Sequence, residues 1–184
     1  MRIITGSARG KRLQAPEGLH TRPTTDRVKE SVFNIIQWDL EGRRVLDLFG
    51  GSGQLGLEAL SRGAAGCTIV EGDRSAQKII EANIKSCGFG DRCRLVRGDA
   101  FAFLQRQGKG SFHVIFLDPP YGGELLNRAV ETICRIDILT QGGIIVCESA
   151  VEDRLAEPPA PYRAVKRYVY GHTAVTIITK EDTE

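Results

Sequence analysis

Apolar, strand-like runs alternate with helix-like segments along the middle of the chain, and this alternation limits the fold more than any other feature. The strand-like runs are Arg44–Phe49, Cys67–Glu71, Arg94–Arg97, Phe112–Leu117 and Gly143–Glu148. The helix-like segments between them are Gln54–Arg62, Ser75–Cys87, Ala100–Gln107 and Glu124–Ile136. A glycine follows each of the first three, as is common where helices end. Strands and helices in this order predict βαβ units, and therefore a mostly parallel sheet covered by helices on both faces.

The pattern changes after Glu148. A proline-rich loop at residues 158–161 precedes two segments of strand composition, Tyr162–Tyr170 and Thr173–Lys180, which only Gly171 and His172 separate. Strands joined by so short a turn must be antiparallel neighbours. We therefore predict an α/β fold with a seven-stranded, mostly parallel sheet and an antiparallel pair at one edge.

The N-terminal stretch predicts a hairpin followed by a helix. Residues 2–5 and 11–14 flank a glycine-bounded turn at 6–10. A helix that begins near Thr24–Asp26 gains one apolar face from Val28, Val32, Ile35 and Ile36. The chain of 184 residues has the length of one domain. We expect residues 1–25 to form an N-terminal β-hairpin arm, residues 26–184 to form the α/β core of the same domain, and Trp38, just after the first helix, to lie in that core.

The composition excludes several classes of protein. With 41% hydrophobic residues the chain can bury a core, yet no apolar run approaches the roughly 18–20 residues of a membrane span. Glycine and charge follow Met1 too early for a signal peptide. The five cysteines are odd in number and lack CxxC spacing, and the three histidines are scattered, so neither a disulfide framework nor a metal site is expected. These features fit a cytoplasmic protein that binds no metal and no membrane.

Charge is concentrated near the N-terminus. Residues 1–36 contain seven Lys or Arg and three Asp or Glu, a net charge of +4, which leaves −2 for the rest of a chain whose total is +2. A basic arm on a mildly acidic body suggests a polyanionic partner, although an ordinary solvated surface would explain the same count.

Acidic residues end four of the predicted strands. The strand ends read Asp47-Leu48-Phe49-Gly50-Gly51-Ser52-Gly53, Glu71-Gly72-Asp73, Gly98-Asp99-Ala100 and Asp118-Pro119-Pro120-Tyr121. In open α/β sheets, ligands bind outside the carboxyl ends of the strands. Four carboxylates at that edge contribute nothing to a core, so they indicate a binding site there.

The first of these loops contains the glycine spacing of dinucleotide-binding proteins. Gly51-x-Gly53-x-x-Gly56 is followed by Glu71, which is placed to bind a ribose hydroxyl. An NAD-binding oxidoreductase is therefore one alternative. The acidic edge disfavours it, because a pyrophosphate is an anion and binds best to helix N–H groups and cations. A neutral or cationic ligand suits this edge better.

The stretch Val45-Leu46-Asp47-Leu48-Phe49-Gly50-Gly51-Ser52-Gly53 resembles the first motif of class I S-adenosylmethionine-dependent methyltransferases. The resemblance implies a Rossmann-like class I methyltransferase fold and S-adenosylmethionine as the cofactor. It also implies that Glu71 binds the ribose hydroxyls and that Asp99 meets the adenine amino group. The expected cofactor-binding residues in the core are Asp47, Phe49, Gly50, Gly51, Ser52, Gly53, Glu71, Gly72, Asp99, Ala100 and Asp118.

Asp118-Pro119-Pro120-Tyr121 resembles the Asp-Pro-Pro-Tyr box of methyltransferases that modify exocyclic amino groups of bases. Such an amine is a poor nucleophile because its lone pair is delocalised into the ring. The Asp118 carboxylate and the Pro119 carbonyl can accept hydrogen bonds from the two N–H groups of the amine, and the two prolines stiffen the loop. Tyr121 offers a ring on which an extruded base can stack. We take Asp118, Pro119, Pro120 and Tyr121 as the candidate catalytic residues.

The N-terminal residues, including Arg22-Pro23-Thr24-Thr25-Asp26-Arg27, resemble the bacterial RsmD family of 16S ribosomal RNA guanine-N2 methyltransferases. The resemblance implies a 16S rRNA or assembling 30S partner and places Arg22 and Thr24 at the methionine end of the cofactor. Because a base-modifying enzyme must hold the phosphates around an extruded base, Arg9, Lys11, Arg12 and Arg27 are the candidate RNA-binding residues. A DNA adenine-N6 methyltransferase and a catalytically silent RNA-binding module remain alternatives.

Overall fold

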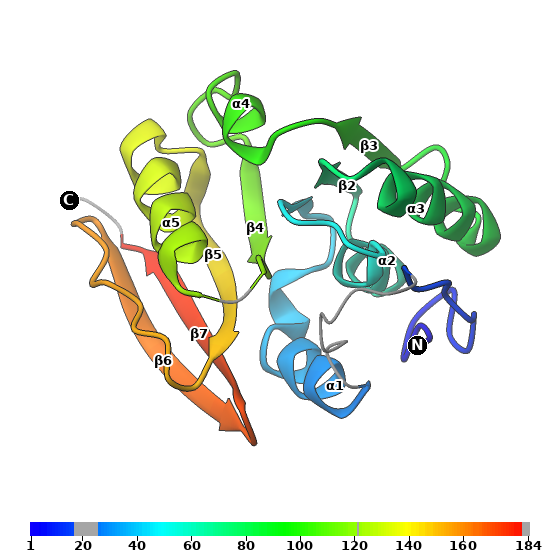
Figure 1. The fold of residues 1–184 in the computed structure, drawn as a ribbon, viewed down its shortest axis with the longest axis horizontal. Helices are drawn as coiled ribbons and strands as arrows, with labels where there is room; N and C mark the ends of the chain where they lie inside the picture. Colours follow the sequence, from blue (N-terminus) through cyan, green and yellow to red (C-terminus); the bar gives the residue numbers. More distant parts are fainter. Residues whose placement is uncertain (17–25, 121, 182–184) are drawn as a thin grey trace.

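The computed structural model describes residues 1–16, 26–120 and 122–181. Its centre is a seven-stranded sheet with the order β3-β2-β1-β4-β5-β7-β6 (Figure 1). The strands are β1 (Arg44–Asp47), β2 (Gly66–Glu71), β3 (Cys93–Arg97), β4 (Phe112–Leu117), β5 (Leu139–Ala150), β6 (Tyr162–Tyr170) and β7 (Thr173–Lys180). The first five strands are parallel, and β7 pairs antiparallel with both β5 and β6. The predicted α/β fold with an antiparallel edge pair is confirmed.

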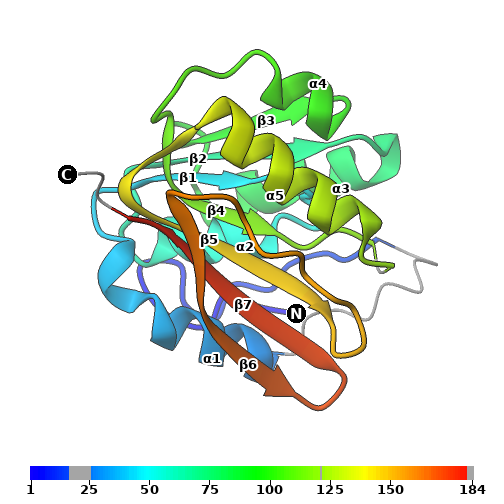
Figure 2. The same ribbon diagram turned by 90° about the vertical axis from the view of Figure 1, so that its left-hand side faces the viewer.

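Helices cover both faces of this sheet. They are α1 (Asp26–Ile35), the 3-10 helix η1 (Gln37–Asp39), α2 (Gln54–Ser61), α3 (Arg74–Cys87), α4 (Ala100–Leu104) and α5 (Glu124–Ile136). Buried side chains of α1, α2 and α3 form one hydrophobic cluster with one face of the strands, and those of α4 and α5 form a second cluster with the other face. Figure 2 shows the two layers of helices on either side of the sheet.

The side-chain alternation of β1 explains why both faces are buried. Val45 belongs to the cluster beneath α1, α2 and α3, whereas Leu46 belongs to the cluster beneath α4 and α5, and both are fully buried. Successive side chains of a strand point to opposite faces, so a strand covered on both sides needs a continuous apolar run. That requirement is why the alternation of apolar runs and helices could be recognised in the sequence.

The N-terminal arm, residues 1–14, packs against α2 and α3 (Figure 1). It folds back on itself as the predicted antiparallel hairpin, with a bridge between Arg2 and Arg12. Backbone hydrogen bonds on either side of this bridge join Ile3 to Lys11 and Leu13 to Met1. Ile3, Ala8 and Leu13 are buried in the hydrophobic cluster of α1, α2 and α3. The hairpin also forms hydrogen bonds with the neighbouring helices α2 and α3.

Several expectations need correction. Trp38 does not lie in the core, because η1 turns it outward and its exposed fraction is 86%. Strand β5 begins at Leu139 and ends at Ala150, beyond both predicted bounds, because it pairs with β4 on one side and with β7 on the other. Helix α4 ends at Leu104 and is shorter than predicted. In the described part of the chain, no helix has the length and apolar character needed to cross a membrane.

Candidate functional site

The acidic strand ends lie at one edge of the sheet. Asp47 at the end of β1 is level with Ile69 of β2 and with Phe116 of β4. Two residues further along these strands come Phe49, Glu71 and Asp118. Strand β1 lies between β2 and β4 and is parallel to both, so the carboxyl ends of the three strands lie side by side. The strand order changes direction between β1 and β4, and open α/β sheets bind ligands at such a point.

The glycine-rich loop between β1 and α2 connects directly to Glu71. The Gly51 N–H donates to Glu71 Oε2 at 2.8 Å, and the Gly50 N–H donates to the Val70 carbonyl at 2.9 Å. A side chain at Gly50 would lie 2.5 Å from Ile69 Cγ2, so the loop needs a glycine there to pack on β2. Gly51 differs: its φ is +57°, and a Cβ there would meet nothing within 4 Å among the described residues. The loop therefore packs closely on the sheet at Gly50 and borders open space at Gly51.

Asp47 lies beneath this loop and is almost completely buried. Its Oδ2 accepts a hydrogen bond from the Gly56 N–H at 3.1 Å, which ties the end of β1 to the first turn of α2. Its Oδ1 is buried and has no hydrogen-bond partner among the described residues. Burial raises the pKa of Asp47 to about 7, and the nearby charge of Glu71 adds to this, while the Gly56 N–H opposes it.

Glu71 and Asp99 are held by backbone N–H groups. Glu71 is half-buried and its Oε1 accepts from the Asp73 N–H at 2.7 Å, in addition to the bond from Gly51. The Gln77 side chain donates to the Glu71 carbonyl and fixes the end of β2. Asp99 is exposed, and its Oδ1 accepts from the Ala102 N–H at the start of α4. Both carboxylates therefore have fixed positions at the edge of the sheet.

The box after β4 lies beside these acids. Asp118 is half-buried, Pro119 is buried and Pro120 is exposed. Tyr121 lies outside the described residues, as do Arg22 and Thr24. Because β4 pairs directly with β1, Asp118 and Pro119 follow the strand next to the one that leads into the glycine loop.

The residues at this edge suit S-adenosylmethionine. That cofactor carries positive charge, a ribose diol and an adenine. Asp47, Glu71 and Asp99 supply carboxylate oxygens, the orphaned Asp47 Oδ1 is a buried acceptor, and the space beside Gly51 is open. Acceptors and negative charge at one edge match hydroxyl, amino and cationic groups, and they would repel a pyrophosphate.

The predicted RNA-binding cations lie on the arm and on α1. Arg9, Lys11 and Arg12 are exposed on the arm, and Arg27 is exposed in the first turn of α1. The arm's turn contacts Ser61 at the C-terminal end of α2, whereas Met1 and Gln14 lie near the glycine loop at its N-terminal end. An α-helix rises about 1.5 Å per residue, so eight residues of α2 separate these two contact points by about 12 Å.

Several polar residues that attach the arm were not foreseen from the sequence. Glu58 is fully buried on α2 and accepts from the backbone N–H groups of Ile4 and Thr5 at 2.8 and 3.1 Å. The fully buried Lys29 of α1 donates to the Arg2 carbonyl and lies 3.9 Å from Glu58 Oε2. Burial lowers the pKa of Lys29, and the charge of Glu58 opposes that shift. The only sequence signal for such residues is a polar side chain on the apolar stripe of a helix.

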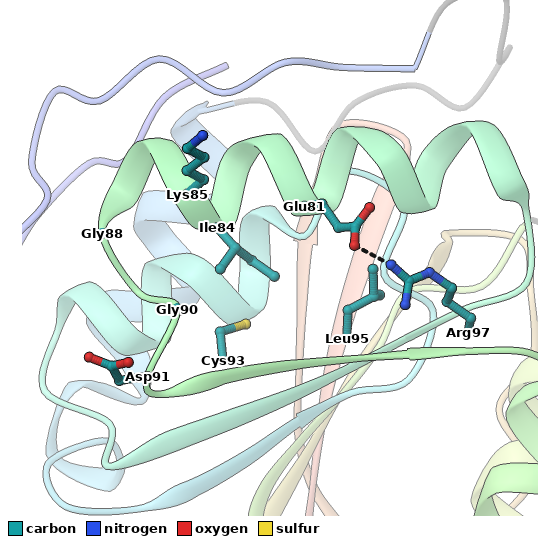
Figure 3. Close-up of a pocket in the computed structure, with 9 residues that line it drawn as sticks. All are labelled: Glu81, Ile84, Lys85, Gly88, Gly90, Asp91, Cys93, Leu95 and Arg97. Carbon is teal, nitrogen blue, oxygen red and sulfur yellow. Dashed lines mark hydrogen bonds and ion pairs between the residues drawn. The ribbon is translucent and has the colours of Figure 1, made fainter.

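The pocket in Figure 3 lies elsewhere, along the edge strand β3. It has a volume of about 560 Å³ between α3 and β3, and an ion pair between Arg97 and Glu81 crosses its lining. Its lining residues include neither the glycine loop nor Glu71. Among the described residues, no group of three His, Cys, Asp or Glu side chains is arranged to hold a metal ion. The five cysteines are free, and four of them are buried.

Comparisons with known proteins agree with this geometry. Residues 1–179 match the model of the family described as conserved hypothetical protein 95. "Putative rRNA methyltransferase YlbH" of Bacillus subtilis is 41% identical over 98% of this chain and 99% of its own length. "Ribosomal RNA small subunit methyltransferase D" of Escherichia coli is 36% identical over 98% of this chain and 90% of its own length. The solved structure of "Putative methyltransferase yhhF from Escherichia coli" superposes with a TM-score of 0.87 and 38% identity, and the match covers 98% of each chain.

Proposed function

The chain belongs to the family described as conserved hypothetical protein 95, the RsmD family, and from this membership we propose that it methylates the exocyclic N2 of a guanine in 16S rRNA with S-adenosylmethionine as the methyl donor. The resemblance expected from the sequence is thereby confirmed at the level of the family. An rRNA substrate also supports a cytoplasmic protein.

One observation carries the proposal: Glu71 and the Asp118 box lie level with each other at the ends of β2 and β4, on either side of β1 and its glycine loop. A donor held by Glu71 and the loop would therefore lie beside an acceptor held by Asp118. Positioning two reactants in this way converts a bimolecular reaction into one within a single complex, which is a large part of many enzymatic rate accelerations.

The proposed roles at the donor side follow from the acceptors present. Glu71 would bind the ribose hydroxyls, Asp99 the adenine amino group, and the backbone at Gly51 would border the cofactor. When bound, S-adenosylmethionine supplies a methyl group on a positively charged sulfur. The carboxylates at the edge favour that charge, whereas they would disfavour the pyrophosphate of the alternative NAD-binding oxidoreductase.

The proposed roles at the acceptor side follow from the chemistry of an aromatic amine. The Asp118 carboxylate and the Pro119 carbonyl would accept hydrogen bonds from the two N–H groups of the amine and so turn its lone pair toward the methyl donor. As the new N–C bond formed, the bond between the methyl carbon and the donor sulfur would break and leave a neutral thioether. One N–H proton would leave the amine, and Asp118 would accept it directly or through water. The carboxylate does not need to be a strong base, because the amine becomes acidic only as the methyl group is transferred.

The experiment that tests this proposal is nucleoside mass spectrometry of 16S rRNA from cells with and without the gene. We expect N2-methylguanosine to be lost from one position and restored by the wild-type gene but not by Asp118→Ala. Purified protein should then methylate unmodified 16S rRNA or 30S particles, and comparing the two identifies the form that it recognises. Unchanged N2-methylguanosine in the deletion strain, or a preference for adenine N6 in duplex DNA, would refute the guanine-N2 assignment.

A further inference from the structure

We propose that Asn83 is a positioning residue that couples RNA binding on the arm to cofactor binding at the glycine loop. This inference rests on the proposed function. Asn83 lies in the middle of α3, its exposed fraction is 1%, and it does not belong to any motif recognised in the sequence.

The Asn83 side chain joins two segments that are far apart in the sequence. Its Oδ1 accepts from the Gln14 N–H at 2.8 Å, and its Nδ2 donates to the Gln14 carbonyl at 3.0 Å. The same Nδ2 donates to the carbonyl of Ser52 in the glycine loop at 2.9 Å. Both hydrogens and the oxygen of the carboxamide are therefore used. A buried group with every bond satisfied holds its partners strongly, because releasing either one leaves a buried polar atom unpaired.

A second contact joins the arm to the same loop residue. The Ser52 hydroxyl, which is buried, donates to the Met1 sulfur at 3.1 Å. Ser52 was predicted to bind the cofactor, yet its side chain and its carbonyl both contact residues on the arm side. The glycine loop therefore lies between two neighbours: Glu71 on the cofactor side, through the Gly51 N–H, and the arm on the other side, through Ser52.

The rest of the arm is attached firmly enough to transmit this coupling. Glu58 accepts from the N–H groups of Ile4 and Thr5, and the Ser61 hydroxyl accepts from the Ala8 N–H and donates to the Thr5 carbonyl. All eight residues of α2 are buried, because the sheet covers one side of this helix and the arm packs against it from another. The arm with its exposed cations is thus one unit with the helix that begins at the glycine loop.

The coupling has a simple physical origin. A ligand that orders the glycine loop fixes the Ser52 carbonyl, which fixes Asn83 and, through it, Gln14. RNA that binds the arm afterwards loses less conformational freedom, so it binds more tightly. Linkage requires the effect to be reciprocal: RNA on the arm must raise the affinity for the cofactor by the same factor.

The test measures the affinity for unmodified 16S rRNA with and without saturating S-adenosylhomocysteine, the demethylated product, which cannot donate a methyl group. In the wild type we expect the product to tighten RNA binding by about fivefold or more, within the usual range of coupling energies. In Asn83→Ala the ratio of the two RNA affinities should fall toward one. A residue that only stabilised the fold would weaken both affinities and leave their ratio unchanged.

Asn127→Ala is the matched control. Asn127 on α5 holds a loop by the same pair of bonds, because its Nδ2 donates to the Arg154 carbonyl at 2.9 Å and its Oδ1 accepts from the Ala156 N–H at 2.8 Å. It contacts neither the arm nor the glycine loop in these bonds, so the ratio should stay at the wild-type value. Gln14→Pro is a second test that leaves the sequence of α3 unchanged, because the substitution lies on the arm and removes the N–H that Asn83 Oδ1 accepts, and it too should lower the ratio.

The outcomes separate the two proposals. If the wild type binds both 16S rRNA and S-adenosylhomocysteine but the ratio is one, or if both Asn83→Ala and Gln14→Pro keep the wild-type ratio, the coupling is refuted and the proposed function stands. If the wild type fails to bind either ligand, the proposed function and the coupling both fail.

Discussion

Glu71 and Asp118 lie at the ends of β2 and β4, on either side of β1, yet their surroundings suit them to different tasks. Glu71 is fixed by the N–H groups of Gly51 and Asp73 next to the open space at the glycine loop, whereas Asp118 begins a loop stiffened by two prolines. Glu71→Ala should weaken S-adenosylmethionine binding by about tenfold or more, because hydrogen bonds to a charged group are lost. Calorimetry with the purified variant measures this change.

Asp118→Ala should lower the rate of methyl transfer more than the affinity for the cofactor. We expect kcat to fall by about a hundredfold or more, because the variant loses an acceptor that aligns the amine, while the cofactor affinity changes by less than about threefold. Single-turnover methylation and calorimetry on the same preparation measure the two effects. Equal losses of cofactor affinity in Glu71→Ala and Asp118→Ala would contradict this division of roles.

The buried Asp47 predicts a pH dependence of stability. Burial raises its pKa from an ordinary value of 3.8 to about 7, so between about pH 4 and pH 7 the folded protein keeps a proton that the unfolded chain has lost. The contribution of Asp47 to stability is therefore present below pH 4, declines as the pH rises toward 7 and is level above it, with a slope of at most about 1.4 kcal/mol per pH unit.

The control for this prediction is Asp47→Asn, which keeps an oxygen for the Gly56 N–H and does not titrate. Thermal unfolding of both proteins between pH 4 and pH 8 should show the wild type losing stability relative to Asp47→Asn as the pH rises. Parallel curves of melting temperature against pH would show that Asp47 is already ionised in the folded protein at low pH.

The residues of the site differ in how far the sequence alone could identify them. Asp47, Glu71, Asp99 and Asp118 could be predicted because each directly follows or ends an apolar run, and parallel strands bring such positions to one edge. Asn83 could not, because the partners that satisfy its carboxamide are 31 and 69 residues away in the sequence. A polar residue at a buried helix position indicates that it has a partner but does not identify that partner.

At the scale of elements, the turn of the arm contains two glycines that face different surroundings, and only Gly6 lies against α2. Gly6 and Gly10 both have φ between +80° and +90°. A Cβ at Gly6 would lie 1.8 Å from the Ser61 carbonyl oxygen, whereas a Cβ at Gly10 would meet nothing within 4 Å among the described residues. Gly10→Ala should cost about 1–2 kcal/mol from backbone strain alone, and Gly6→Ala about 1–3 kcal/mol more because the arm must move away from α2.

Thermal unfolding and limited proteolysis measure this difference. Gly6→Ala should expose the arm to cleavage at a protease concentration that leaves the wild type and Gly10→Ala intact. If the two variants melt at the same temperature and are cleaved at the same rate, the close approach of the arm to Ser61 is not important for stability.

The elements themselves were predicted with uneven success for a physical reason. The strands and the helices between them follow from local apolar periodicity, so their order could be derived, and so could most of their bounds apart from those of β5 and the end of α4. The arm forms the predicted hairpin, but the side chains that hold it on the helices (Glu58, Ser61 and Asn83) could not be predicted, because they lie 53 to 69 residues away in the sequence. The prediction that Trp38 lies in the core was wrong, because only the tertiary structure shows that η1 turns its side chain to solvent.

At the scale of the whole molecule, the charge on the arm predicts how RNA binding responds to salt. Arg9 and Arg12 are exposed cations on the arm, so each should neutralise a phosphate of bound RNA. Replacing both by Ala should weaken RNA binding and reduce the slope of log K against log salt by about 1.4–1.8, because each lost phosphate contact removes about 0.7–0.9. Filter binding at several salt concentrations measures the slope.

Arg106→Ala is the control, because Arg106 is an exposed cation that follows α4 on the opposite face of the sheet. The slope of log K against log salt for Arg106→Ala should match that of the wild type. An equal reduction in slope for Arg106→Ala would show that RNA binding depends on overall charge and not on the arm.

The long reach of the arm's bonds also bears on how the protein matures while it is being made. Residues 4–14 bind to partners 53–69 positions further along the chain. At about 5–20 residues per second, translation leaves this segment without its partners for roughly 3–14 s after it is synthesised. During that interval Ile3 and Leu13, buried in the finished protein, have no core to enter. The arm can therefore reach its final position only after α2 and α3 have been synthesised, and its apolar side chains stay exposed until then.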